Sequence, residues 1–166
     1  MALQTSIAVT VIGKQTETRD LVNPAATLER VVTQALSSGA GLNQADRMFS
    51  DIRTIGATTN DDLDLAGSLT DAFGVTVTFA RLKMIFVQNP ATNTGNVEIG
   101  GATNPMVGYV GDATDKILIP PGGFALLVAP TATGWAVTAT TGDILRIRNA
   151  GSTSQDIPVI LIGAAT

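Results

Sequence analysis

The sequence predicts an all-β protein that folds as a two-sheet β-sandwich of jelly-roll type. Short apolar or β-branched segments recur at intervals of roughly 8–12 residues, and turn-forming Gly, Pro, Asn and Asp residues separate them. Hydrophobic residues make up 45% of the 166 residues, which is enough for a substantial core. Because no change in composition marks a linker, we expect residues 27–166 to form one sandwich domain. Residues 1–26 are expected to project from it as an arm or hairpin.

The N-terminal segment predicts that hairpin. Residues 6–12 (SIAVTVI) are rich in β-branched side chains, and Gly13 follows where a tight turn would need glycine. Residues 18–22 would supply the returning strand, and Pro24 separates the hairpin from the next segment.

Residues 28–36 could form either a helix or a strand. Their apolar side chains are spaced as on one face of a helix, but Val31 and Val32 also favour a strand. We expect a strand, because the rest of the chain is β and residues 37–41 (SSGAG) indicate a hairpin loop. The returning strand would be residues 45–55, in which alternate side chains share one face. Those side chains are Arg47, Phe49, Asp51, Arg53 and Ile55.

Residues 75–87 predict the central strand of the sandwich. Apolar and polar residues alternate from Val75 to Phe79, and the apolar positions then shift by one residue before Leu82. A shift of this kind inside a strand is typical of a β-bulge. The end of the segment is apolar at every position from 84 to 87, so we expect it to be buried on both faces.

The rest of the chain predicts short strands separated by turns. Residues 120–123 (PPGG) are the strongest turn, because Pro presets φ and Gly permits positive φ. The aliphatic segment at residues 157–162 indicates a strand covered on both faces, with Pro158 at its start or on an edge. The other expected strands are residues 97–99, 106–110, 116–119, 124–128, 135–137 and 144–148.

Charged residues are unusually scarce. They make up 14% of the chain, against about 25% in an ordinary soluble domain, and only three are lysines. An isolated β domain usually protects its strand edges with charge, and lysine and glutamate are depleted where subunits meet. We therefore expect partner chains to cover much of the surface. A soluble monomer with a threonine-rich surface is the open alternative. The three lysines are Lys14, Lys83 and Lys116.

Several partners are disfavoured by charge and hydropathy. The net charge of −4 argues against nucleic-acid binding, which needs clustered cations. Arg146 and Arg148 would share one face of their strand, opposite Leu145 and Ile147, and are expected to pair with carboxylates. No apolar run approaches the roughly 20 residues of a membrane helix. Residues 1–5 lack the basic and apolar regions of a secretion signal, so we expect none.

The residue types that enzymes use most are missing. Histidine and cysteine are both absent, which removes the commonest general base, the thiol nucleophile, disulfides and the usual transition-metal ligands. We therefore expect no enzymatic activity, and no catalytic, cofactor-binding or metal-binding residues. The glycine-rich segments 95–101 and 121–124 lack the features of a phosphate loop and are interpreted as turns.

Two groups of side chains could bind a ligand, but each has a simpler interpretation. Asp61, Asp62 and Asp64 lack the glycine and distal glutamate of a calcium loop, so we interpret them as a solvated turn, with cation binding left open. The same interpretation applies to Asp112 and Asp115. The second group is a pair of aromatic residues that could stack on a sugar or a base, although packing in the core or an interface is favoured. That pair is Trp135 and Tyr109.

Some segments resemble a group of small virion proteins from tailed bacteriophages. The likeness covers most of residues 44–166, and some of these proteins are similar to capsid decoration, or cement, proteins. The resemblance implies a β-sandwich oligomer bound at symmetry positions on the phage head, and it implies no catalytic residues. The segments that carry it are 44–47 (QADR), 51–55 (DIRTI), 61–74, 75–83, 120–123 and the closing apolar strand.

From these observations we expect a capsid decoration protein. It would be a homotrimer that stabilises the head by bridging capsid subunits, with the major capsid protein and copies of itself as partners. It would be made in the host cytoplasm and lie on the capsid surface, without a cofactor, nucleic acid or membrane. The alternatives are a tail, neck or fibre component, a lectin-like module using Trp135 or Tyr109, and, as the remotest, an enzyme.

Overall fold

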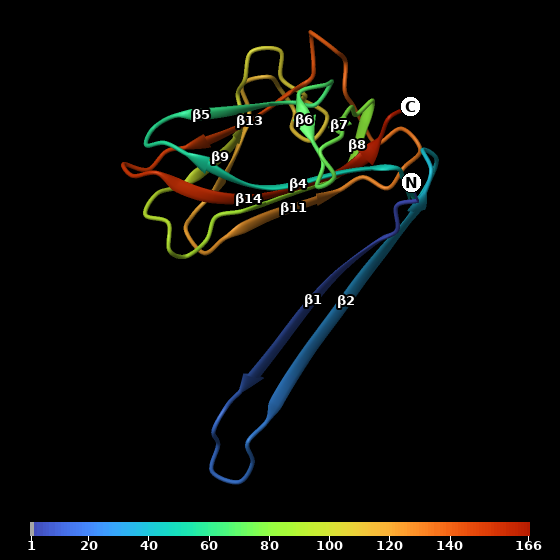
Figure 1. The fold of residues 1–166 in the computed structure, drawn as a ribbon. Helices are drawn as coiled ribbons and strands as arrows, with labels where there is room; N and C mark the ends of the chain where they lie inside the picture. Colours follow the sequence, from blue (N-terminus) through green and yellow to red (C-terminus); the bar gives the residue numbers. More distant parts are fainter. Residues whose placement is uncertain (1) are drawn as a thin grey trace.

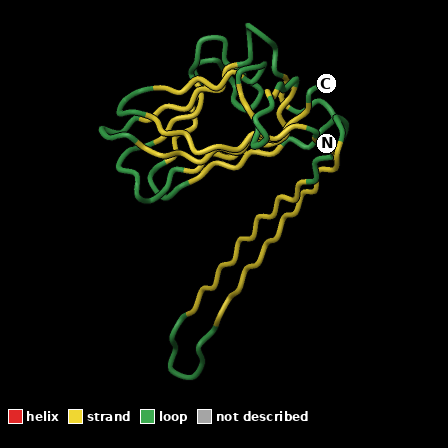
Figure 2. Tube along the Cα trace, viewed as in Figure 1, coloured by secondary structure: helices red, strands yellow, loops and turns green. Residues whose placement is uncertain are grey.

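The computed structural model describes residues 2–166, and every regular element in that range is a β-strand. A body of packed antiparallel sheets carries a long hairpin that projects from one end (Figures 1 and 2). The all-β prediction is therefore confirmed. The sheets remain separate and form a sandwich-like body rather than a barrel. Over the described range, no helix is long and apolar enough to cross a membrane.

Two sheets make up most of the body. The first, here called the β14 sheet, has the strand order β11-β8-β14-β4, with β12 beside β8. Its strands are β4 (Arg47–Ile55), β8 (Arg81–Gln88), β11 (Phe124–Val128), β12 (Trp135–Ala136) and β14 (Gln155–Ala164). The second, the β13 sheet, has the order β10-β9-β13-β5. Its strands are β5 (Asn60–Asp64), β9 (Val97–Gly100), β10 (Lys116–Ile119) and β13 (Ile144–Asn149). A small ladder joins β6 (Leu69–Thr70) to β7 (Thr76–Val77).

The main core lies between these two sheets. Alternate residues of each strand point into it, as in Leu145 and Ile147 of β13 and Val159 and Leu161 of β14, all fully buried. Burying one such side chain contributes about 1.5–3 kcal/mol. The predicted alternation in β13 is confirmed, and so are the strands expected at residues 97–99, 116–119, 124–128, 135–137 and 157–162, to within a few residues.

The hairpin differs from the one expected. It pairs β1 (Thr5–Thr16) with β2 (Ala25–Ser38), and Gly13 lies inside β1 opposite Leu28 rather than at a turn. The connection is residues 17–24, so the strand expected at 18–22 is wrong. Polar residues 14–16 continue β1 because both faces of a projecting hairpin meet solvent, so polarity there does not end the strand.

The second strand of the hairpin settles the ambiguity at residues 28–36, which are strand as expected. Its continuation was predicted wrongly. Residues 37–41 do not form a hairpin loop, because β2 pairs in parallel with the short β3 (Gln44–Ala45) and the chain then enters β4. β2 reaches Ser38, so the hairpin extends beyond residue 26, the expected end of the arm.

The segment at 75–87 is not one bulged strand. The chain leaves β7 after Val77 and enters a different sheet at Arg81, so the shift in apolar phase marks a change of sheet. A register irregularity does occur opposite this point, between Ile162 and Gly163 of β14. A Cβ atom at Gly163 would collide with the Arg81 carbonyl oxygen, so the close approach requires glycine.

Two local predictions have opposite outcomes. The turn at 120–123 is confirmed: the Gly123 amide donates to the Pro120 carbonyl at 2.9 Å, and Gly122 has a φ of 82°. The strand expected at 106–110 is wrong, because the chain there makes only an isolated bridge, at Pro105. Pro158 lies just before the part of β14 that pairs with β8, so its missing amide removes no bond on that side.

Candidate functional site

The hairpin arm has two distinct faces. β1 and β2 pair in unbroken antiparallel register from Thr5 opposite Leu36 to Thr16 opposite Ala25, and residues directly opposite one another share a face. The face that carries Ile7 and Leu36 is here called the near face, because these two side chains are buried with residues of the β14 sheet. Further out, the near face carries Val9, Val11, Leu28 and Val32, all exposed.

The far face of the arm is also partly apolar. Ile12 is 72% exposed and Val31 is half exposed, and their neighbours on this face include the small residues Ala8 and Ala35. The sequence has no charged residue before Lys14. Beyond Arg30 it has none until residue 46. The arm is therefore a two-stranded ribbon with apolar side chains on both faces and few charges along its length.

The outer face of the β14 sheet, which points away from the main core, is apolar as well. Cross-strand register places its side chains in three rows. None of the residues in these rows is charged, and Phe124 and Ile52 are each 63% exposed. The rows are Phe124, Gln88, Pro158 and Ile52; Leu126, Phe86, Ile160 and Ser50; and Val128, Met84, Ile162 and Met48.

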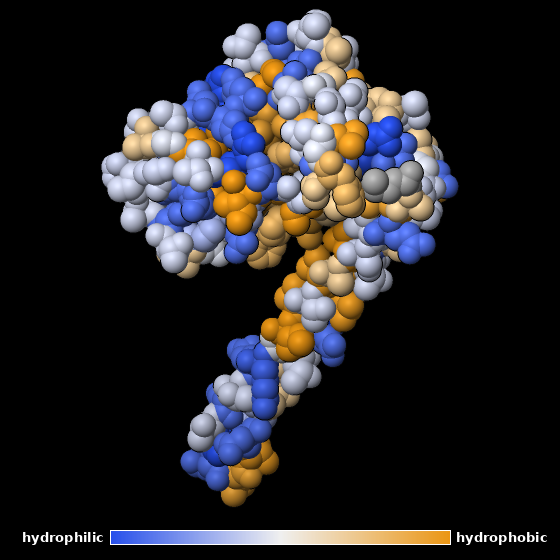
Figure 3. Space-filling view, in the orientation of Figure 1, coloured by the Kyte–Doolittle hydropathy of each residue, from blue (hydrophilic) through white to orange (hydrophobic). Residues whose placement is uncertain are grey.

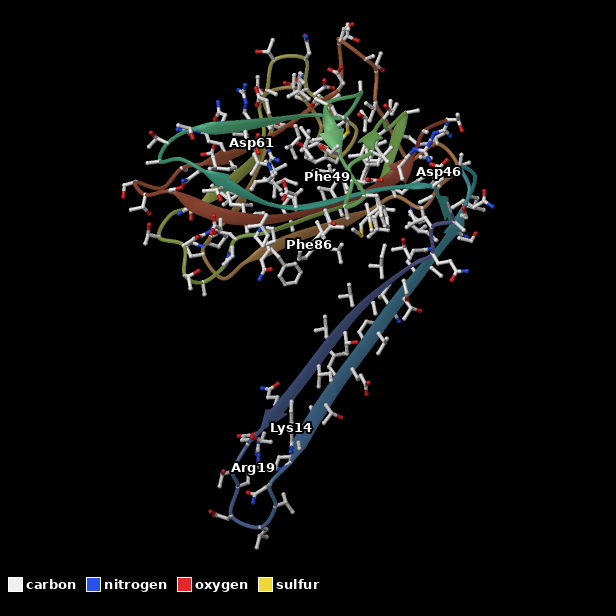
Figure 4. The ribbon with its side chains drawn as sticks, in the orientation of Figure 1. Lys14, Arg19, Asp46, Phe49, Asp61 and Phe86 are labelled. Carbon is white, nitrogen blue, oxygen red and sulfur yellow. The ribbon has the colours of Figure 1, made fainter. Side chains whose placement is uncertain are left out.

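The near face of the arm and this sheet face meet at the base of the arm. Ile7 and Leu36 form a second buried cluster with Ala45, Met84 and Ile162, separate from the main core. From there the arm diverges from the body, and Phe86 points toward the side on which the arm lies (Figures 1 and 4). Apolar surface is visible along the upper arm and beneath the body where the two converge (Figure 3). We call the space bounded by these two apolar surfaces the wedge.

Hydrogen bonds of backbone and side chains hold the base of the arm to the body. The Asn43 amide donates to the Pro130 carbonyl at 2.8 Å, and the Gln34 side chain donates to Asn43 Oδ1 at 3.0 Å. Below them, the Asp46 amide donates to the Gly163 carbonyl at 3.0 Å. Because these bonds join residues of the arm and its following loop to the body, they help to set the direction in which the arm leaves.

Lys83 reinforces the same junction from inside the body. Its side chain is fully buried, and Nζ donates to the carbonyls of Thr131, Ala132 and Gly41. Burial lowers the pKa of Lys83, and the nearby charge of Arg81 lowers it further. A buried ammonium is tolerated where carbonyl oxygens satisfy its donors. Lys83 therefore connects the loop after the arm to the loop at residues 131–132.

The carboxylates singled out in the sequence are structural partners of arginines. Asp61, Asp62 and Asp64 lie in strand β5, not in a turn, so that interpretation is wrong. Asp61 binds Arg53 at 2.6 Å, which closes one edge of the sandwich, and Asp62 binds Arg146 at 2.6 and 2.7 Å. The Asp64 carboxylate accepts the Ala66 amide. Among residues 2–166, no group of three or more His, Cys, Asp or Glu side chains could hold a metal.

The outer face of the β13 sheet is ionic. Glu98 binds Lys116 at 2.9 Å and Arg148 at 3.3 Å, and these bonds, led by that from Lys116, lower the pKa of Glu98. The hydrogen bonds that Arg146 donates to the Asp62 carboxylate raise the pKa of Arg146. The prediction that Arg146 and Arg148 pair with carboxylates is therefore confirmed.

The two aromatic residues considered for stacking are packed against the main core. Tyr109 and Trp135 contact each other edge to face, with ring centroids 6.5 Å apart. Burial raises the pKa of Tyr109 to about 12. Packing, the favoured interpretation, is confirmed for both.

Asp112 and Asp115 form a local turn, in which the Asp115 carboxylate accepts hydrogen bonds from the amides of Gly111 and Asp112.

Sequence reasoning did not find the wedge itself. The signal was present, because residues 84–87 and 157–162 are apolar at nearly every position and were expected to be covered on both faces. The chain covers the second face only at the base of the arm. Comparison of the chain with protein-family models, with curated proteins and with solved structures gives no match.

Proposed function

We propose that this chain is a structural subunit of a tailed-phage virion, a capsid decoration protein that stabilises the head by bridging capsid subunits. Its partners would be the major capsid protein and copies of itself in a homotrimer, and its sheets would follow a jelly-roll topology. One observation carries the proposal: the largely apolar wedge between the arm and the outer face of the β14 sheet, which this chain leaves open and in which Arg30, opposite Val11, is the one charged residue on the arm wall.

The wedge supports an assembly role on energetic grounds. An isolated two-stranded hairpin is at best marginally stable in water, and apolar surface left exposed forgoes about 25 cal/mol per Å². The long edge of β1 is unpaired, and it has no charged residue before Lys14 to discourage pairing with another chain. These costs fall if other subunits cover the arm and the sheet face.

The arrangement also suits a shell. The β1 strand has 12 residues, which corresponds to a reach of about 40 Å at about 3.3 Å per residue. An arm of that length can extend over a neighbouring subunit. The ionic face of the β13 sheet would remain toward solvent, on the opposite side of the body from the wedge.

Quantitative mass spectrometry of separated heads and tails tests the proposal. We expect the protein on heads, in a number comparable to that of the major capsid protein. A few copies per particle, located on tails, would instead favour a tail, neck or fibre component, and absence from virions would contradict both. The lectin-like alternative has no supporting observation, because Trp135 and Tyr109 pack against the core.

Binding to heads that lack the protein provides a sharper test. Phe124→Lys places a charge on the uncovered face of the β14 sheet and should weaken binding at least tenfold. Leu118→Lys is the matched control, because Leu118 is similarly exposed at 57% but lies on the β13 sheet. Equal binding by the two variants would show that the apolar sheet face is not used.

A further inference from the structure

We infer that the wedge of one copy is filled by the hairpin arm of a second copy, so that arms are exchanged between copies. This deepens the proposed function by naming the partner of the arm.

The shape of the wedge defines what can fill it. One wall is the outer face of the β14 sheet, with Phe86 and Phe124, and the other is the near face of the arm, with Val11 and Val32. An occupant therefore needs apolar side chains on two opposite faces.

The arm of another copy meets that requirement. Ile12 and Val31 are exposed on its far face, while Val9, Val11 and Val32 are exposed on its near face. The pairs from Ser6 opposite Ala35 to Thr10 opposite Val31 contain no charged residue, and the next two pairs carry one charge each, Arg30 opposite Val11 on the near face and Glu29 opposite Ile12 on the far face. The arm thus resembles a strand pair that is buried on both sides, although its own chain covers it only at the base.

If the arm closed onto its own body, less of the apolar surface of the arm would be buried. It would bury the near face but leave Ile12 and Val31 in water. Insertion into a neighbour's wedge covers both faces. A ribbon about 40 Å long and about 10 Å wide presents about 400 Å² on each face, or about 800 Å² in total. This matches the roughly 800 Å² per partner of a stable protein interface.

Cross-linking between chains tests the inference. The sequence has no cysteine, so Ile12→Cys in a tagged chain and Phe124→Cys in an untagged chain introduce one thiol each. After co-expression, a short bismaleimide should join tagged to untagged chains. Ile12→Cys with Leu118→Cys is the matched control and should give no such product, because Leu118 lies on the β13 sheet.

Two results would overturn the inference. The first is a double variant, Ile12→Cys with Phe124→Cys, that cross-links only within one chain, because the arm would then close on its own body. The second is the absence of any product above the Leu118 control.

The mass of the purified protein gives an independent readout. We expect an oligomer for the unaltered chain, and at least tenfold weaker association for Ile12→Lys. Because Ile12 is 72% exposed in the single chain, circular dichroism of this variant should remain unchanged. A monomeric unaltered chain, or an Ile12→Lys oligomer of full strength, would contradict arm exchange.

These measurements use the pure protein, so they separate the two proposals. Arm exchange without attachment to heads would remove only the capsid role. Attachment to heads without the Ile12–Phe124 product would remove only arm exchange.

Discussion

The two outer faces of the body differ in a way that their shared sandwich architecture does not require. On the β13 sheet, Glu98, Lys116 and Arg148 form an ionic group, and Arg146 pairs with Asp62. On the β14 sheet, the corresponding three rows carry no charge, and Phe124 and Ile52 are largely exposed. An antiparallel sheet normally has one face on the core and one polar face in water, as the β13 sheet does. The β14 sheet departs from that pattern, and in the proposed assembly its second face would be a contact surface.

The largest expected effect comes from comparing the two faces of the β14 sheet itself. Leu161 is fully buried in the main core, so Leu161→Ala should lower the free energy of unfolding by about 2–5 kcal/mol. Ile52→Ala, on the outer face, should lower it by less than about 0.5 kcal/mol in the dilute single chain. Urea denaturation at low protein concentration measures both. Comparable losses would show that the outer face is already covered within one chain.

An intermediate effect is expected at the junction of arm and body. Lys83→Met keeps the buried stem but removes the donors of three carbonyls, which should cost about 1–3 kcal/mol. Hydrogen exchange should rise at residues 39–46 and 129–134, because the loops that Lys83 connects would loosen. Lys14→Met is the control, because it removes the charge of an exposed lysine on the outer part of the arm, where Lys14 pairs with Thr27. Unchanged exchange in the Lys83 variant would mean that backbone hydrogen bonds alone hold the arm.

A smaller effect should be confined to the ionic face and depend on pH. The pKa of Glu98 is lower in the folded chain than its ordinary value of 4.5, so between the two values the unfolded chain binds more protons. Glu98 therefore stabilises the fold at neutral pH, and this contribution is lost as the pH falls below about 5 through its folded pKa. The difference in unfolding free energy between the unaltered chain and Glu98→Gln should shrink over that range. A constant difference would argue that the Glu98 bonds contribute little.

The smallest effect is expected from the exposed ion pair of the same face. Arg146→Gln should lower the free energy of unfolding by at most about 1 kcal/mol, and 0.5 M salt should reduce the difference, because surface pairs are screened. Association through the apolar wedge should not weaken in the same salt. Dissociation of the oligomer by salt would indicate that the ionic face, rather than the wedge, joins the subunits.

The sequence by itself determined the features that depend on neighbouring residues. The alternation of Leu145 and Ile147 with Arg146 and Arg148 predicted one buried and one charge-paired face, and the structure confirms both. The PPGG turn at 120–123 was equally local, because proline and glycine constrain φ wherever they occur. The scarcity of charge, at 14% of the chain, also predicts that partner chains cover part of the surface, and this stays a prediction.

Only the tertiary structure decided where that surface lies. Gly13 suggested a turn, but β2 pairs with the whole of β1 and carries the arm out to residues 17–24. The apolar shift after Phe79 suggested a bulge, but it marks the passage of the chain to another sheet. Pairing between segments distant in sequence selects the face of each strand that the chain covers. For that reason the wedge, which combines the arm with strands β4, β8, β11 and β14, has no local signature.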